Sequence, residues 1–317
     1  MAKYRHALPQ AAGGLFLSDG GMETALIFLQ GQHLPQFASF VLLEDENGRA
    51  ELMKYYEHFL PIARKHGLGF VLDTATWRAS LDWGRLIGFE PDRLRAVNIA
   101  AVDLVATLRD WWETRATPIV LNGAIGPRGD GYKIARMEAA EAQDYHAFQV
   151  DIFAGTQADM VSAITMNTIN EAVGIARAAK AAGMPCVISF TVEMDGKLID
   201  GTTLRAAIEA TDEATSASPA YYMVNCAHPI HFEQALERDE AWVTRIHGVR
   251  ANASAKSHAE LDESDTLDIG DMADLSRRYS ALMRAFPSMH ILGGCCGTDH
   301  RHLAAICEVC MPDSGMA

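Results

Sequence analysis

Eight short apolar runs, each followed by a stretch with helical periodicity, constrain the fold of this chain more than any other feature. The intervening stretches are amphipathic, and several end in a glycine at the expected helix C-terminus, such as Gly67 and Gly183. Because parallel strands need helical crossovers and eight such units close on themselves, the sequence predicts an α/β protein with a single (β/α)8 TIM-type barrel domain over residues 1–317. The runs span residues 14–21, 67–77, 118–127, 158–165, 185–192, 221–227, 246–254 and 289–298.

The composition is typical of a globular protein that acts on small molecules. The 27 Lys and Arg residues stand against 41 Asp and Glu residues, and the net charge of −14 disfavours nucleic acid and anionic membranes as partners. The N-terminal MAKYRHALPQ has no apolar signal region, and no apolar run approaches the roughly 18 residues of a membrane span. Six cysteines in such a chain indicate a reducing, cytoplasmic setting, where clustered cysteines favour metal binding or catalysis. The sequence leaves a homo-oligomer open.

Nearly every run changes from apolar residues to small, polar or sulfur-containing residues at its C-terminal end. A polar residue can simply mark the end of a strand, but the same change in eight units favours a shared site. Barrel enzymes build their sites on that face of the barrel, so we expect the functional residues there. The candidates are Asp19, Thr74, Thr76, Asn122, Thr165, Thr191, Asn225, Cys226, Asn252, Cys295 and Cys296.

The stretch ILGGCCGTDH places Cys295 and Cys296 side by side between glycines. A disulfide between neighbours is disfavoured, because their Cα atoms lie only about 3.8 Å apart. The glycines permit a bend that turns both thiols toward one partner. Cys226 ends the sixth run and opens on the same mouth of the barrel. The three thiols therefore predict a zinc ion with three thiolate ligands and an open fourth position, which is the catalytic arrangement. The alternative is that Cys226 is a small core residue and the tandem pair is incidental.

The other thiols and histidines carry weaker signals. Cys186 opens a buried strand, and Cys307 and Cys310 share one face of the last helix, so packing is the expected role of all three. His228 follows Cys226 closely and is a candidate for contact with a metal ligand, although a capping or solvated role is the default. The GGCCG element lacks the Gly-Lys-Ser/Thr ending of a phosphate-binding loop.

Three thiolates favour one kind of zinc chemistry. They make the metal electron-rich and a weak Lewis acid toward water, whereas an incoming thiol would be deprotonated and remain nucleophilic. The reaction that fits is displacement by sulfur at a methyl carbon of a sulfonium or quaternary ammonium donor. Two other functions stay open: a non-catalytic barrel stabilised by zinc, which needs a fourth protein ligand such as His228, and zinc-dependent hydrolysis, which the sulfur ligands discourage.

The chain resembles the homocysteine S-methyltransferases, a family of zinc-dependent barrels. The motifs that carry the resemblance are LSDGGMETAL, TATWRAS, GAIGPRGDGY, QDYHAF, SFTVEMDGKLIDG, MVNCAHP and LGGCCGTDHRHLAAI. The resemblance implies Zn²⁺ on Cys226, Cys295 and Cys296. It further implies that Asp19 faces the ammonium of the thiol substrate and that backbone N–H groups at Gly20 and Gly21 face its carboxylate. Thr74 and Asn225 would line the site.

One departure from the family pattern concerns the acceptor. Many members carry a glutamate at the end of the fourth strand, where it contacts the substrate ammonium, and this chain has Ile164 at that position. Either Asp19 is a sufficient anchor, or another carboxylate such as Glu193 substitutes, or the acceptor is not homocysteine.

A second departure concerns the methyl donor. Arg78 stands where the betaine-using branch has an aromatic residue, and a fixed cation is a poor neighbour for a quaternary ammonium. Trp77 and Tyr132 could offer ring faces to an onium methyl group, or could simply pack. We therefore expect a zinc-dependent methyltransferase that prefers a sulfonium donor over betaine and methylates a thiol, with homocysteine giving methionine. The alternative keeps the zinc barrel with another thiol acceptor or another methyl carrier.

Overall fold

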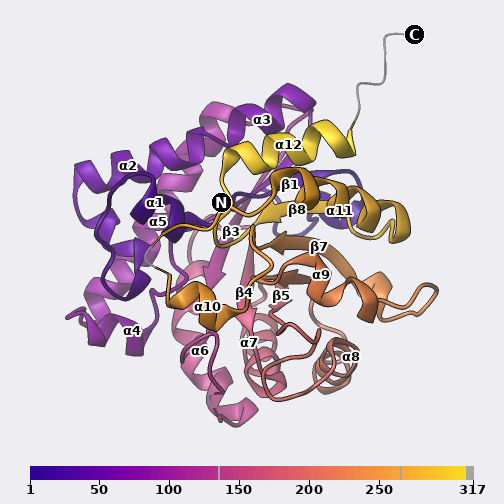
Figure 1. The fold of residues 1–317 in the computed structure, drawn as a ribbon. Coiled ribbons are helices and arrows are strands. Elements are labelled where there is room, and N and C mark those ends of the chain that lie inside the picture. The colour runs from indigo at the N-terminus through magenta and orange to yellow at the C-terminus, as the bar shows by residue number, and fades with distance from the viewer. Residues whose placement is uncertain (135, 265, 312–317) are drawn as a thin grey trace.

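The computed structural model describes residues 1–134, 136–264 and 266–311. Residues 135, 265 and 312–317, which the predicted domain includes, lie outside the described residues. Eight parallel strands form one closed barrel in the order β1 to β8, and helices surround it (Figure 1). The fold is the predicted (β/α)8 barrel.

Each strand overlaps one of the predicted runs. Consecutive strands pair in parallel, and β1 closes the barrel by pairing with β8 through Phe16 and Ile291. The strands are β1 (Phe16–Leu17), β2 (Gly69–Asp73), β3 (Ile119–Ile125), β4 (Met160–Met166), β5 (Cys186–Phe190), β6 (Tyr221–Asn225), β7 (Ile246–Ala251) and β8 (Ile291–Gly294).

Two helices end at or just before the glycines that the sequence indicates. The chain leaves α3 at Gly67 with φ 62° and passes Gly183 after α7 with φ 67°, a left-handed conformation that glycine adopts at little cost. The helices are α1 (Met22–Phe28), α2 (Glu46–Glu57), α3 (Leu60–His66), α4 (Leu81–Leu86), α5 (Pro91–Trp112), α6 (Ala139–Ala154), α7 (Ile169–Ala181), α8 (Leu204–Thr215), α9 (Pro229–Phe232), α10 (His258–Asp262), α11 (Met272–Ala285) and α12 (His300–Cys310).

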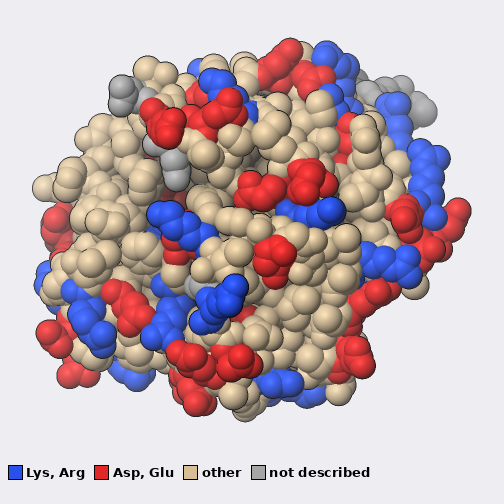
Figure 2. Space-filling model, turned by 60° about the horizontal axis from the view of Figure 1, so that its bottom comes forward, with Lys and Arg blue, Asp and Glu red and all other residues tan. Residues whose placement is uncertain are grey.

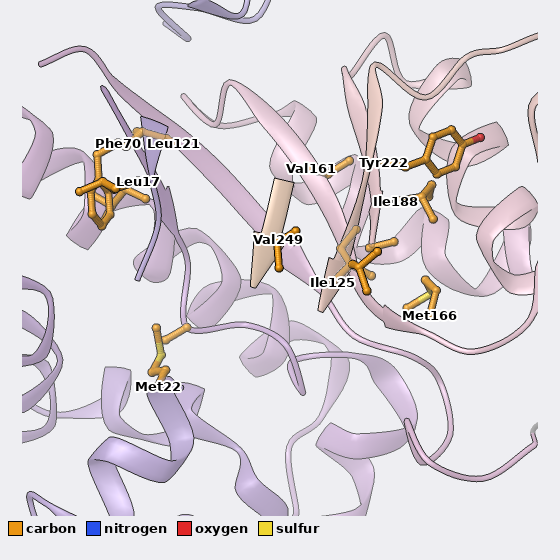
Figure 3. Close-up of a cluster of buried hydrophobic side chains, with 14 of the residues drawn as sticks. Leu17, Met22, Phe70, Leu121, Ile125, Val161, Met166, Ile188, Tyr222 and Val249 are labelled. Atoms are coloured by element: carbon orange, nitrogen blue, oxygen red, sulfur yellow. The ribbon is translucent and has the colours of Figure 1, made fainter. Parts of the chain in front are cut away.

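The strands are apolar on both faces because each face is buried. Outward-pointing residues such as Phe70 and Leu121 pack against the helices in the large core cluster (Figure 3). Their neighbours Val71 and Val120 point inward and fill the interior of the barrel at the N-terminal ends of the strands. Leu8 of the N-terminal segment packs in the same cluster and helps to cover that end. The interior is therefore packed at its N-terminal end, and the C-terminal ends of the strands are left to form the site.

The surface carries charges of both signs. Acidic and basic side chains are interspersed over the face shown in Figure 2. Among the described residues, no helix combines the length and the apolar character that a membrane span needs.

Candidate metal centre

A cavity of about 480 Å³ opens at the C-terminal ends of the strands, on the face where the sequence predicts the site. Residues from the ends of β2, β3, β4, β6, β7 and β8 and from the loop after β1 meet there. The predicted site residues that line this cavity are Asp19, Gly20, Gly21, Thr74, Cys226, Cys295 and Cys296. The eighth, Asn225, is fully buried next to Cys226, and the contacts of its amide are described below.

Three sulfur atoms come together at the base of this cavity. The Sγ atoms of Cys226, Cys295 and Cys296 lie within 4.8 Å of one another, the one such group of potential metal ligands among the described residues. Cys226 and Cys295 are joined as a disulfide with a Cα–Cα distance of 5.4 Å, and Cys296 lies beside them. Tetrahedral zinc with Zn–S bonds near 2.3 Å holds its sulfurs about 3.8 Å apart. In their reduced form the three cysteines thus fit a zinc ion.

The backbone bends that present these thiols follow from local sequence. Cys226 comes directly after β6 and has φ 53°, while its N–H donates to the carbonyl of Arg250 at 3.1 Å. Cys295 follows β8 and donates to the carbonyl of Ala251 at 2.8 Å. The turn then closes through Gly297, whose φ of 79° suits glycine. The bend that lets two adjacent cysteines serve one ion is therefore present after β8.

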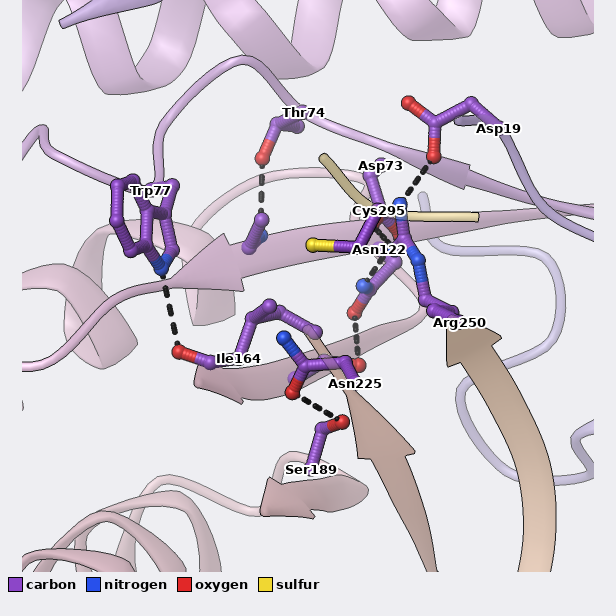
Figure 4. Close-up of polar contacts among 12 residues, drawn as sticks. Asp19, Asp73, Thr74, Trp77, Asn122, Ile164, Ser189, Asn225, Arg250 and Cys295 are labelled. Carbon is purple, nitrogen blue, oxygen red and sulfur yellow. Dashed lines mark hydrogen bonds and ion pairs between the residues drawn. The ribbon is translucent and has the colours of Figure 1, made fainter. Parts of the chain in front are cut away.

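Asn225 lies behind the cysteine cluster and supports it through hydrogen bonds. Its side-chain oxygen accepts a hydrogen bond from the Ser189 hydroxyl at 2.7 Å (Figure 4). The same oxygen accepts from the Thr165 N–H at 3.0 Å, and the Asn225 amide donates to the Thr165 hydroxyl at 2.9 Å. Thr165 has φ 66°, a strained conformation for a β-branched residue, and its hydroxyl lies 3.9 Å from the Sγ of Cys226. Asn225 therefore holds in place a strained residue that touches a metal-site cysteine.

The remaining cysteines pack as expected. Cys186 and Cys307 belong to the hydrophobic core, and burial raises the pKa of each thiol to about 12. Cys310 is partly buried against the same core. His228 caps α9, where its Nδ1 accepts from the Ile230 N–H at 3.4 Å, and burial lowers its pKa to about 4. The group of potential metal ligands consists of the three cysteines and does not include His228.

A buried ionic triad, which the sequence reasoning missed, lies beside the cysteines. Arg250 at the end of β7 forms ion pairs with Asp19 and with Asp73 at the end of β2 (Figure 4). Asp19 also accepts from the Tyr55 hydroxyl at 3.0 Å, and Asp73 accepts from the Asn122 amide at 2.7 Å. The available signal was an acidic and a basic residue at the ends of two otherwise apolar strands, because opposite charges buried at one end of a barrel must pair.

Burial dominates the electrostatics of the triad. Asp19 is only 1% exposed, and this desolvation raises its pKa to about 7. The Arg250 guanidinium opposes that rise, and the negative charge of Asp73 adds to it. Arg250 stays protonated, since the two carboxylates raise its pKa despite its burial.

The other groups predicted to bind the substrate form ion pairs or hydrogen bonds within the protein. Glu193 pairs with the Nδ1 of His258 at 3.2 Å, and the Nε2 of that ring contacts the carbonyl of Cys226 at 2.5 Å. The Gly21 N–H donates to the carbonyl of Thr298 at 3.0 Å. Ile164 lines the cavity, so the position at which the resemblance led us to expect a glutamate faces the site.

The aromatic residues near the predicted donor site also have neighbours. The Arg78 guanidinium lies over the rings of Trp77 and Trp83, at 4.1 Å and 3.6 Å from their centroids. The Tyr132 ring packs against His258 with 4.2 Å between centroids. All four of Arg78, Trp77, Trp83 and Tyr132 line the cavity, so a fixed cation lies within the aromatic part of its wall.

The fold and the site together define a class: a (β/α)8 barrel with a three-cysteine centre that fits a metal ion at the strand ends, next to a charged cavity. The sequence model of the homocysteine S-methyltransferase family matches residues 16–310. The chain therefore belongs to the homocysteine S-methyltransferase family.

Solved structures agree with this fold. The metallated form of the homocysteine methyltransferase MmuM from Escherichia coli superimposes with a TM-score of 0.73 and 19% identity over 96% of this chain and 99% of that one. The oxidized form gives a TM-score of 0.74 with the same identity and coverage. At this identity the likeness shows a shared fold. Among curated protein sequences none matches the chain.

Proposed function

We propose that this protein is a zinc-dependent S-methyltransferase that moves a methyl group from a small onium donor to a thiol. Homocysteine is the acceptor that family membership supports, and methionine would be the product. The observation that carries the proposal is the meeting of Cys226, Cys295 and Cys296 within 4.8 Å at the strand ends of a cavity large enough for two small substrates. We also propose that the protein works in a reducing, cytoplasmic setting, because the ligands must be thiolates.

The three cysteines would hold zinc, and zinc when bound would supply an acceptor thiol as a nucleophilic thiolate at neutral pH. Because zinc would lower the pKa of the acceptor thiol, no cavity residue needs to act as a general base. The protein's own contribution is to fix the cysteines through Asn225 and Thr165 and to orient the two substrates. Transfer then needs the sulfur and the methyl carbon in line with the neutral leaving group.

A sulfonium compound is the donor that we favour over betaine. Arg78 lies in the cavity wall over Trp77 and Trp83, so the ring faces beside it are shared with a guanidinium. Either onium cation would bind close to that fixed positive charge, and the bulkier quaternary ammonium gains less from rings that already have a cationic partner. A sulfonium group presents its methyl groups on a smaller, pyramidal centre.

The rival hypothesis keeps the zinc and the barrel and changes the acceptor or the methyl carrier. Ile164 in the cavity wall motivates it, because the carboxylate of other family members is lost there. The experiment is a matrix of thiol acceptors against sulfonium, betaine and folate donors, measured on reduced protein loaded with zinc. Methylation of homocysteine by a sulfonium donor supports the proposal, methylation of another thiol alone supports the rival, and no transfer in any combination contradicts both.

A further inference from the structure

We propose that Asp73, held beside Asp19 by Arg250, supplies the second carboxylate of the site that binds the ammonium group of the acceptor thiol. The family glutamate at the end of β4 is replaced by Ile164, and Asp73 would provide the missing negative charge from the end of β2. Asp73 would be a binding residue and Arg250 a positioning residue. This inference rests on the proposed function, since it assigns part of the acceptor site.

The triad contains two acidic groups and one basic group, so one more cation would balance its charge. When both carboxylates are ionised they share a single guanidinium, which leaves one net negative charge on residues that are 1% (Asp19), 5% (Asp73) and 8% (Arg250) exposed. A buried charge without a counter-charge is costly, and all three residues line the cavity. An ammonium group that enters the cavity beside the triad would complete the charge balance.

The triad and the cysteines line the same cavity, and backbone contacts join the segments that carry them. The Arg250 Nε donates to the carbonyl of Gly294 at 3.3 Å, and Gly294 directly precedes Cys295. The Gly294 N–H in turn donates to the carbonyl of Asp19 at 2.8 Å. The backbone carbonyl of Arg250 accepts from the N–H of Cys226 at 3.1 Å. A thiol bound at the cysteines would therefore have the triad in the wall of the cavity that holds its carbon chain.

The alternative carboxylate for this role is less well placed. Glu193 was the substitute that the sequence suggested, but it pairs with His258, which itself contacts the carbonyl of Cys226. Asp73 instead shares Arg250 with Asp19, the residue that the family assigns to the ammonium. Two carboxylates on one guanidinium are fixed relative to each other, and such a pair makes a preorganised receptor for a cation.

The test compares two acceptors that differ only in the amino group. Homocysteine and γ-mercaptobutyrate, its deaminated analogue, are methylated by the wild type and by Asp73→Asn, each reduced and loaded with zinc. The expected result is that Asp73→Asn raises KM for homocysteine by about 30-fold while KM for γ-mercaptobutyrate changes less than about threefold. Asp73→Glu, which keeps the charge, should recover part of the difference. Glu44→Gln, which removes a carboxylate paired with Arg93 at the surface, is the charge control.

Equal changes of KM for both thiols in Asp73→Asn, or no change for either, would overturn the inference and leave the proposed function standing. Arg250→Lys should also raise KM for homocysteine more than kcat falls, since it disturbs the position of both carboxylates. If no thiol is methylated by the wild type, the proposed function fails. Calorimetric titration without donor then decides the inference: Asp73→Asn must weaken the binding of homocysteine to zinc-loaded protein at least about tenfold more than that of γ-mercaptobutyrate, and equal changes contradict it. If Asp73→Asn does not fold, the same titration is made with Asp73→Ser.

Discussion

Cys226 and Cys295 are joined as a disulfide although 69 residues separate them along the chain. The closed barrel explains the contact, because β6 and β8 are one strand apart and their C-terminal ends face the same cavity. A disulfide and a zinc site built on the same sulfurs exclude each other, since zinc binds thiolates.

Oxidation should prevent zinc binding, and reduction should restore it. Protein treated with a mild oxidant is expected to contain a Cys226–Cys295 disulfide in a peptide map and to bind no zinc, whereas reduced protein binds one zinc per chain. Metal analysis paired with mass spectrometry measures both quantities on one sample. Oxidised protein that carries both the disulfide and a full equivalent of zinc would refute the shared-sulfur assignment.

Replacing the third cysteine should separate zinc binding from the disulfide. Cys296→Ala is expected to lose stoichiometric zinc, because one thiolate ligand is gone, yet to form the Cys226–Cys295 disulfide on oxidation. Cys295→Ala should lose both. Cys310→Ala is the matched control, since that thiol packs against the core and should leave zinc at one per chain. Full zinc in both Cys295→Ala and Cys296→Ala would show that the ligands lie elsewhere.

Asn225→Ala should destabilise the protein through its buried hydrogen bonds. The change leaves the Thr165 N–H and hydroxyl and the Ser189 hydroxyl without their partner, which costs roughly 2–3 kcal/mol in the free energy of unfolding. Denaturant unfolding measures that difference. Asn170→Ala, at an exposed position, should cost less than about 1 kcal/mol. Similar losses for the two variants would mean that the Asn225 contacts contribute little.

The raised pKa of Asp19 predicts a fall in stability with increasing pH. The carboxyl ionises near pH 4 when unfolded and at about 7 when folded, because burial and Asp73 oppose its charge more than Arg250 and the Tyr55 hydroxyl favour it. Between these values the folded state binds the extra proton, so this group's contribution to stability is full below pH 4 and is lost as pH rises to about 7.

The variant Asp19→Asn tests this dependence. It lacks the titrating group, so the free energy of unfolding of the variant minus that of the wild type should increase as pH rises from 4 to about 7 and stay level above that. Denaturant unfolding at a series of pH values gives the difference. A difference that is flat, or that decreases over this range, would show that Asp19 is ionised in the folded protein throughout.

The sequence predicted the architecture and the meeting of the three cysteines because both depend on local patterns. The eight apolar runs became the eight strands, and a thiol at the end of the sixth run necessarily shares the barrel mouth with thiols at the end of the eighth. The glycines around Cys295 and Cys296 indicated the bend that the backbone makes there.

The sequence did not predict the contacts that depend on which side chains meet across the barrel. Asp73 and Arg250 are 177 residues apart, and neither belongs to a motif that points to the other. Asn225 was expected to line the site, but its amide bonds to Thr165 and Ser189 behind Cys226. Such pairings are set by the register and tilt of all eight strands, which local patterns do not specify.

X-ray absorption at the zinc edge, on reduced and zinc-loaded protein before and after homocysteine is added, tests whether three cysteines hold zinc with a fourth position open to a thiol. We expect three sulfur neighbours at about 2.3 Å and one lighter atom at first, and four sulfur neighbours once the thiol is present. A spectrum with mainly nitrogen or oxygen neighbours, or one that homocysteine leaves unchanged, would contradict this expectation.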